Sequence, residues 1–308
     1  MAGYPTSVGF PNHSGSYIPT MFAMQLLIEF YKKTIFLEIA TTEHEGDLSK
    51  GGDILKIRNL PEIDSKPWVK GQDLEYQTPK GGSVDLTIDK GQYWGISLDD
   101  LDGVQIDLPY AQKWAAHAAT KQTIAIDKAV LAGTYSSAHA DNQGATAGVE
   151  SSFNLGTAGV PWASTKENLV DKIIECGVVL DEQDVPDENR WFAIPSWMCG
   201  QLKSSDLKDA SLTGDDVSPL RNGRVGSIDR FSIYRTNNLA TGTDTYPVTN
   251  CMFGHKSAIA FASQMKKTET LRNTKAFGDI MRSLQAYGYL VQKSEGLGLL
   301  YARNGSGS

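Results

Sequence analysis

The chain has 308 residues, of which 40% are hydrophobic and 21% charged, and its formal net charge is −7. This length suffices for one or two domains with a large buried core, and the acidic balance provides no global basic field to attract nucleic acid or an anionic membrane. Its three cysteines are far apart and form no C-x-x-C pair, which argues against a disulfide framework and favours a reducing compartment. Because we find no signal-peptide pattern and no apolar run long enough to span a bilayer, we expect a protein made in the cytoplasm without a membrane partner.

The N-terminal region is predicted to be an arm that has no core of its own. Residues 1–20 are rich in Gly, Ser, Pro and Asn and contain few large apolar side chains. The next residues carry apolar side chains at helical spacing, which predicts a first helix: Met24, Leu27, Ile28 and Tyr31. A β-rich stretch near residues 35–39 and a strand at 54–58, stopped by Pro61, are expected to follow.

Residues 61–95 predict a long β-hairpin. In its second half, Val84, Leu86 and Ile88 alternate with Asp85, Thr87 and Asp89, the pattern of a strand with one buried face. The other face is polar and the loops are rich in Gly and Lys, so the hairpin has too few apolar groups to anchor both faces on one core. We therefore expect it to project and to find support elsewhere, for example on a neighbouring subunit.

The strongest helix signal covers residues 108–131. Asp107 is a suitable N-cap, Pro109 suits the first turn, and Gly133 is expected to terminate the helix. The Gly-, Ala-, Ser- and Thr-rich sequence that follows predicts a surface loop.

The second half predicts short alternating elements. Ser164 and Glu167 form a capping-box pattern for a helix that Pro186 ends. The apolar face of this helix is expected to consist of Leu169, Ile173, Gly177 and Leu180. A strand in "RWFAIP", a helix in "PSWMCGQL", a strand pair containing Phe231, Ile233 and Tyr234, and β-rich C-terminal runs are expected next.

The acidic stretch after that helix has two interpretations. Its carboxylates are Asp181, Glu182, Asp184, Asp187 and Glu188. An acid/base site would need some of them buried around a pocket, and nothing in the sequence buries them. We therefore interpret the stretch as a connector whose carboxylates are solvated or paired with Arg190 or Lys172.

Signatures of enzymes and metal sites are not found. There is no phosphate-binding loop, no zinc-protease motif and no nucleophile elbow. Asp100, Asp102 and Gly103 match part of a calcium loop, but Leu98 and Pro109 occupy the positions of its first and last ligands. The sequence thus predicts neither catalysis, nor a cofactor, nor a metal.

The order of these parts resembles the tailed-bacteriophage major capsid proteins. The resemblance rests on the polar arm, a hairpin with "WVKGQDLEYQ" and "YWGISLDDLD", a long helix ending in "IAIDKAVLAG", and "VVLDEQDVP" followed by "RWFAIP". Asp184 stands where this family more often has Asn. The resemblance implies an α+β Johnson fold and a coat subunit without catalytic activity.

The same resemblance implies a division of the chain. Its parts are an N-terminal arm with the first helix (1–40), an extended hairpin or E-loop (61–95), a peripheral domain (41–60, 96–156 and 255–302) with a spine helix (108–131), an axial domain (157–254) and a free tail (303–308). Inter-subunit contacts are then expected at Trp68, Lys70, Tyr76, Lys80, Lys90, Tyr93 and Trp94.

The implied protein assembles with itself as pentamers and hexamers into an icosahedral shell. This virion capsid encloses double-stranded DNA without sequence-specific binding, and its expected partners are portal and scaffolding proteins and, in some relatives, a decoration protein. An encapsulin-type nanocompartment shell is the alternative with the same fold. A tube or sheath subunit, and a hydrolase using Asp100 with Asp102 or Glu182 with Asp184, are alternatives from other classes.

Overall fold

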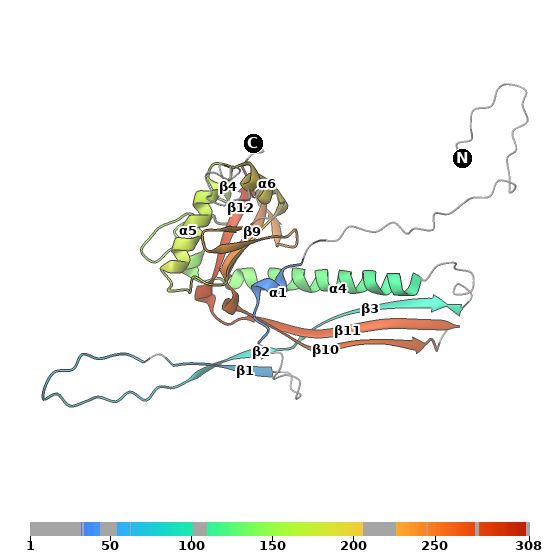
Figure 1. Cartoon of the computed structure of the whole chain (residues 1–308), viewed down its shortest axis with the longest axis horizontal. Helices are drawn as coiled ribbons and strands as arrows, with labels where there is room; N and C mark the ends of the chain where they lie inside the picture. Colours follow the sequence, from blue (N-terminus) through green and yellow to red (C-terminus); the bar gives the residue numbers. More distant parts are fainter. Residues whose placement is uncertain are drawn as a thin grey trace, which may run out of the picture.

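The computed structural model describes residues 32, 34–43, 54–61, 63–100, 110–205, 226–244, 246–274 and 277–305. A long helix, α4 (Tyr110–Thr134), runs along a three-stranded sheet, and a second body with a seven-stranded sheet lies at one end of the helix (Figure 1). A two-stranded hairpin projects beyond this end (Figure 1). The first helix expected around Met24–Tyr31 and the cap at Asp107 and Pro109 lie outside the described residues.

The seven-stranded sheet contains the main core. Its order is β4-β12-β9-β5-β7-β6, and β8 pairs with β9. The strands are β4 (Trp162–Ser164), β5 (Arg190–Ile194), β6 (Ser227–Ile228), β7 (Phe231–Arg235), β8 (Thr241–Thr243), β9 (Pro247–His255) and β12 (Leu297–Asn304). All five residues of β5 are buried, and Phe192 stacks on Phe253 at a centroid distance of 5.6 Å. The predicted strand in "RWFAIP" and the strand pair after it are confirmed.

Helices α5 (Leu169–Asp181) and α6 (Ser196–Ser204) belong to the same body. The expected apolar face of α5 is confirmed, because Leu169, Ile173 and Leu180 are buried. The capping box is wrong: Ser164 lies in β4 and its hydroxyl donates to Gln201 Oε1 at 2.6 Å. A tertiary partner thus takes the hydroxyl that the local pattern assigned to the helix.

The three-stranded sheet has the order β10-β11-β3, with β3 (Lys90–Asp99), β10 (Ile259–Arg272) and β11 (Gly278–Val291). The predicted spine helix is confirmed as α4, but it continues through Gly133, so the expected terminator is wrong. A Cβ at position 133 would lie 2.1 Å from the hydroxyl of Tyr289 in β11. Gly133 is therefore explained by close packing of helix on strand.

The hairpin differs from the prediction in its pairing. β1 (Ile54–Asn59) pairs antiparallel with β2 (Gly82–Thr87), whereas residues 90–95 belong to β3 and pair with β11. The predicted strand at 54–58 is confirmed, but the hairpin of 61–95 shifts to strands on either side of a loop at 60–81. Local alternation identifies a strand and not its partner, which explains the error.

Two segments expected to be irregular or extended are more ordered than predicted. Residues 36–39 form a helical turn, α1 (Phe36–Ile39), instead of β structure. The loop after α4 contains 3-10 turns at Tyr135–Ser137 and Ala140–Asn142, and Ala147 and Leu155 in it are buried. The C-terminal strand β12 extends through Asn304, into the expected tail, and pairs with β9.

A buried carboxylate explains the turn at α1. Asp127 Oδ1, on α4, accepts hydrogen bonds from Ile35 N (3.0 Å) and Phe36 N (2.9 Å), and its Oδ2 accepts one from Asn238 Nδ2 (2.6 Å). Burial raises the pKa of Asp127, and these hydrogen bonds oppose the rise. The tertiary acceptor stabilises a turn that β propensity alone would not predict.

We expect Asp127→Ala to lower the free energy of unfolding by about 3 kcal/mol, because it leaves three buried donors without their acceptor. Urea unfolding followed by circular dichroism measures this change. Lys128→Ala, at an exposed neighbour on the same helix, should change stability by less than about 0.5 kcal/mol. Equal effects of the two substitutions would contradict the role of Asp127.

The base of the hairpin is held by a small second core. Leu86 of β2 is buried against Ala260 and Ala262 of β10, with Leu55 and Ile57 of β1 packed beside them. The end of β2 approaches β11 so closely that a Cβ at Gly288 would lie 2.2 Å from the carbonyl oxygen of Thr87. The hairpin is therefore attached by few contacts between small residues.

Gly288→Ala should displace the hairpin base and cost about 2 kcal/mol of stability, because the added methyl has no space. Thermal unfolding and the rate of proteolysis at residues 60–81 measure the two effects. At Gly91, in the neighbouring strand β3, a Cβ would meet atoms only at 3.9 Å. Gly91→Ala is thus the matched control and should alter neither quantity.

Candidate assembly surface

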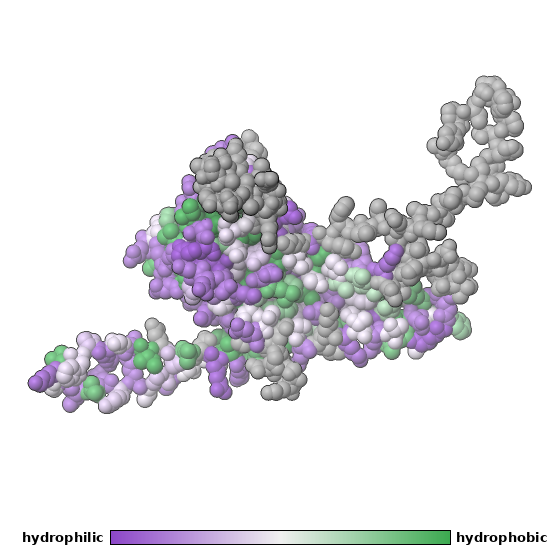
Figure 2. Space-filling model, in the orientation of Figure 1, coloured by the Kyte–Doolittle hydropathy of each residue, from purple (hydrophilic) through white to green (hydrophobic). Residues whose placement is uncertain are grey.

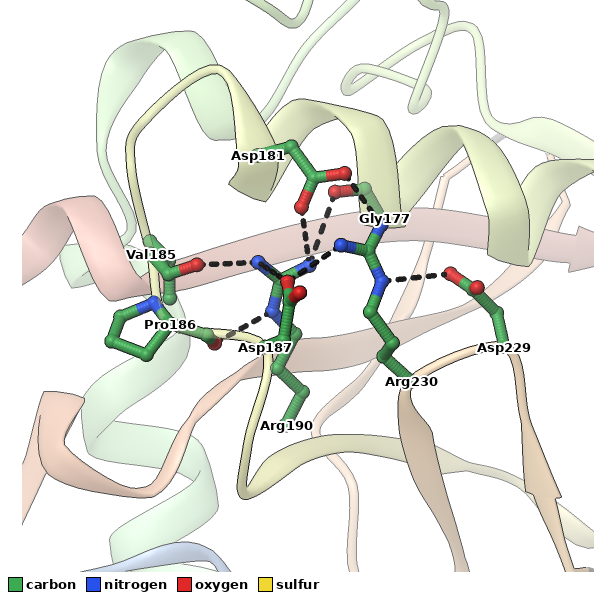
Figure 3. Close-up of polar contacts among 8 residues, drawn as sticks. All are labelled: Gly177, Asp181, Val185, Pro186, Asp187, Arg190, Asp229 and Arg230. Atoms are coloured by element: carbon green, nitrogen blue, oxygen red, sulfur yellow. Dashed lines mark hydrogen bonds and ion pairs between the residues drawn. The ribbon is translucent and has the colours of Figure 1, made fainter.

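The acidic stretch after α5 is a structural connector, as its sequence predicted. Figure 3 shows Arg190 and Arg230 between Asp181 and Asp187, with Asp229 beside Arg230. The fully buried Arg190 lies 2.7 Å from Asp181 and 3.1 Å from Asp187. It also donates to Pro186 O at 2.9 Å, and to the carbonyl oxygen of Val185. The sequence indicated Arg190, but Arg230, far along the chain, was missed.

The remaining carboxylates of this stretch do not form an acid/base pair. Glu182 accepts hydrogen bonds from the N–H groups of Val149 (2.6 Å) and Glu150 (3.0 Å), which fastens the loop after α4 to the end of α5. Lys172, the other expected partner, pairs with Glu175 instead. Asp100 is paired with Arg272, and Asp102 lies outside the described residues.

Other reactive groups give no site in the described part of the chain. No cluster of three or more His, Cys, Asp and Glu side chains suited to a metal occurs there. Burial raises the pKa of the Cys176 and Cys251 thiols, which keeps them protonated and unreactive. Among the described helices, none is long and apolar enough to cross a membrane.

The most unusual surface is the loop of residues 60–81, which connects β1 to β2. Gln72 N donates to Val69 O (3.1 Å) in a turn at its tip, where Gly71 has φ +91°. The two sides of the loop are joined by a hydrogen bond from Asp64 N to Gln77 Oε1 (3.2 Å) and an ion pair between Lys66 and Glu75 (2.6 Å). The loop is thus an ordered projection with hardly any support from the body.

This projection exposes large apolar side chains, which Figure 2 shows as green residues spaced along it. Tyr76 is 87% and Trp68 65% exposed. The other exposed apolar residues of the loop are Leu60, Ile63, Val69 and Leu74. Exposed apolar groups in such density mark an interaction surface.

The predicted contact residues fall in two places. Trp68, Lys70, Tyr76 and Lys80 are exposed on the projecting loop. Lys90, Tyr93 and Trp94 instead lie in β3, where Tyr93 is 80% exposed and the other two are half-buried. Lys90 Nζ lies 4.6 Å above the ring of Tyr289 and 2.7 Å from Asp89, so its contacts lie within this chain.

Comparison with solved structures finds phage capsid proteins over nearly the whole chain. A structure from Mycobacterium phage Che8 matches with a TM-score of 0.72 and 26% identity, over 95% of this chain and 99% of its own. The capsid of cyanophage P-SCSP1u matches with a TM-score of 0.68, 17% identity and 94% coverage of both chains. The capsid of Ralstonia phage GP4 gives 0.64 and 15%, over 97% and 99%.

No protein-family profile and no curated protein matches the sequence. The structural matches nevertheless confirm the resemblance that the order of elements indicated: the chain has the mixed α+β fold of phage capsid subunits.

The two arginines of the connector should differ in their importance. Arg190→Ala should lower the free energy of unfolding by about 3 kcal/mol, since it removes a buried cation with several hydrogen bonds. Arg230 is one-third exposed, so Arg230→Ala should cost at most about 1 kcal/mol. Urea unfolding at neutral pH checks both values, and equal losses would contradict this ranking.

The Arg190 effect should also depend on pH. Burial opposes ionisation of Asp181, but hydrogen bonds and charge from Arg230 and Arg190 outweigh it and lower its pKa. A lowered folded-state pKa adds stability above the unfolded value of about 3.9, which is lost as pH falls through the folded pKa. The difference between wild type and Arg190→Ala should therefore shrink in strong acid.

Proposed function

We propose that this chain is the major capsid protein of a tailed bacteriophage, which self-assembles into the head shell around double-stranded DNA. The observation that carries the proposal is the agreement of fold with phage capsid proteins over nearly the full length of both chains. The ordered but unsupported loop at residues 60–81 adds a reason in this chain's own structure. Its exposed side chains gain burial only when another molecule covers them.

The parts of the subunit take the following roles in this proposal. β1, β2 and the loop between them form the E-loop, α4 is the spine helix of the peripheral domain with the three-stranded sheet, and the seven-stranded sheet forms the axial domain. Capsomers are pentamers and hexamers of the chain. Portal, scaffolding and decoration proteins are the partners that the family resemblance adds.

Each subunit contributes several modest contacts, and their effects combine because every subunit is held at several points. The net charge of −7 suits an enclosing shell, since a protein with few unpaired cations releases few DNA counterions and does not adhere strongly to its contents. Sequence-specific DNA contacts are not part of the proposal.

The nanocompartment shell is the second candidate, and the capsid titles of the structural neighbours favour the virion coat over it. Electron microscopy of the purified protein separates the remaining alternatives. Closed shells with pentameric and hexameric capsomers support the coat, helical tubes indicate a tube or sheath subunit, and an enzyme enclosed in the shells indicates a nanocompartment.

The loop predicts a specific assembly defect. Trp68→Ala with Tyr76→Ala should raise the concentration needed for shell formation by at least roughly thirtyfold, because truncating a buried aromatic anchor costs about 2 kcal/mol or more. Light scattering measures the threshold and thermal unfolding verifies the subunit. Ile174→Ala removes a comparably exposed apolar side chain on α5 and is the control. An unchanged threshold for the double variant would rule out the loop as an interface.

A further inference from the structure

A cavity of about 300 Å³ lies between α4 and the three-stranded sheet. Thr120, Thr123 and Ile124 line it from the helix, and Trp94, Thr268 and Ser283 line it from the three strands. The indole N–H of Trp94 is buried and has no hydrogen-bond partner among the described residues. A buried donor of this kind requires an acceptor that a further group supplies.

The other polar groups of the cavity are already satisfied. Thr120 and Thr123 donate to the carbonyl oxygens one turn earlier in α4, at 2.9 and 3.1 Å. Thr268 and Ser283 hydrogen-bond each other across two strands at 3.1 Å. Gln122 Nε2 donates to Gln92 O at 2.7 Å. The lining therefore presents methyl groups and an indole ring, a surface suited to apolar side chains.

The chain itself arrives at this cavity. Ile35 and Phe36 are fixed on Asp127, whereas Thr34 and Lys32 line the cavity together with residues 119–124 of α4, one to two turns nearer the start of that helix. Lys32 Nζ also donates to Asn237 O at 3.1 Å. Followed toward lower residue numbers, the chain thus runs antiparallel to α4 and leaves residue 32 beside its N-terminal half.

The residues immediately before Lys32 have the chemistry that the cavity lacks. Met24, Leu27, Ile28 and Tyr31 form an apolar stripe at helical spacing, and this segment has no core of its own. Tyr31 and the backbone carbonyls bring hydrogen-bond acceptors for the indole of Trp94. We propose that residues 24–31 dock as a helix in the groove between α4 and the three-stranded sheet of their own subunit.

Tethering favours the chain's own segment over that of a second copy. The stripe begins one residue before the anchored Lys32, so its effective concentration at the groove is on the order of millimolar and does not fall on dilution. The inference concerns the unassembled subunit, and it can therefore fail while the shell function stands, or hold while the shell function fails.

Thiol labelling of the unassembled subunit tests the docking. Thr123→Cys places a reporter thiol in the groove, and the native cysteines are buried. Leu27→Glu should speed maleimide labelling of this reporter by at least about tenfold, because burying a Leu is worth more than one decade in an equilibrium constant. Gln25→Glu adds the same charge beside the stripe and should leave the rate unchanged. Lys128→Cys, exposed on α4 outside the groove, reports on general unfolding and should label equally in all backgrounds.

Protection of the reporter thiol that Leu27→Glu removes, that Gln25→Glu retains and that persists on dilution supports the proposal. Protection that disappears on dilution would place a second copy's segment in the groove and overturn it. Rapid labelling in every background would show an open groove and would overturn it as well.

Discussion

The arrangement of this subunit depends on one buried carboxylate. Asp127 lies in the middle of the second half of α4 and binds the backbone before α1 as well as Asn238, in the connection after β7. A buried ionised group is costly unless each oxygen has donors, and here both oxygens have them. Three parts of the chain that are remote in sequence are thereby joined at one point. The directions in which the N-terminal segment, the spine helix and the seven-stranded sheet leave this point follow from it.

The core is distributed unevenly around that point. Most large buried side chains belong to a single cluster that includes Trp191, Phe192 and Phe253, whereas the base of the hairpin rests on Ala260, Ala262 and Leu86. Small side chains bury little area, so the hairpin gains little stability from its own subunit. A projection of this kind is consistent with a chain whose remaining burial comes from copies of itself.

The sequence predicted well those elements whose signal is local. The uninterrupted helix pattern of α4, the apolar face of α5 and the buried strand β5 needed no knowledge of distant residues. The failures all involve a tertiary partner. α1 depends on Asp127, the pairing of β2 depends on Leu55 and Ile57, and the second arginine of the connector lies 49 residues from Asp181.

The candidate contact residues show the same division. Trp68 and Tyr76 are exposed as expected, because a loop rich in Gly, Lys and polar residues has no core to cover them. Trp94 was grouped with them, but it lies in β3 and turns part of its ring toward α4. One-residue alternation along a strand places Tyr93 and Trp94 on opposite faces. Assigning them to one surface required the strand's partner, which the sequence did not identify.

Two kinds of apolar surface therefore remain on the described subunit, and they differ in how they are covered. The loop at residues 60–81 lies far from the rest of its own chain, so its coverage depends on subunit concentration. The groove beside α4 lies where the chain's own N-terminal segment arrives, so its coverage is intramolecular and independent of concentration. If both inferences hold, the groove fills when the subunit folds and the loop only when subunits meet. That order keeps the apolar stripe of residues 24–31 from causing association before the specific contacts of the loop are made.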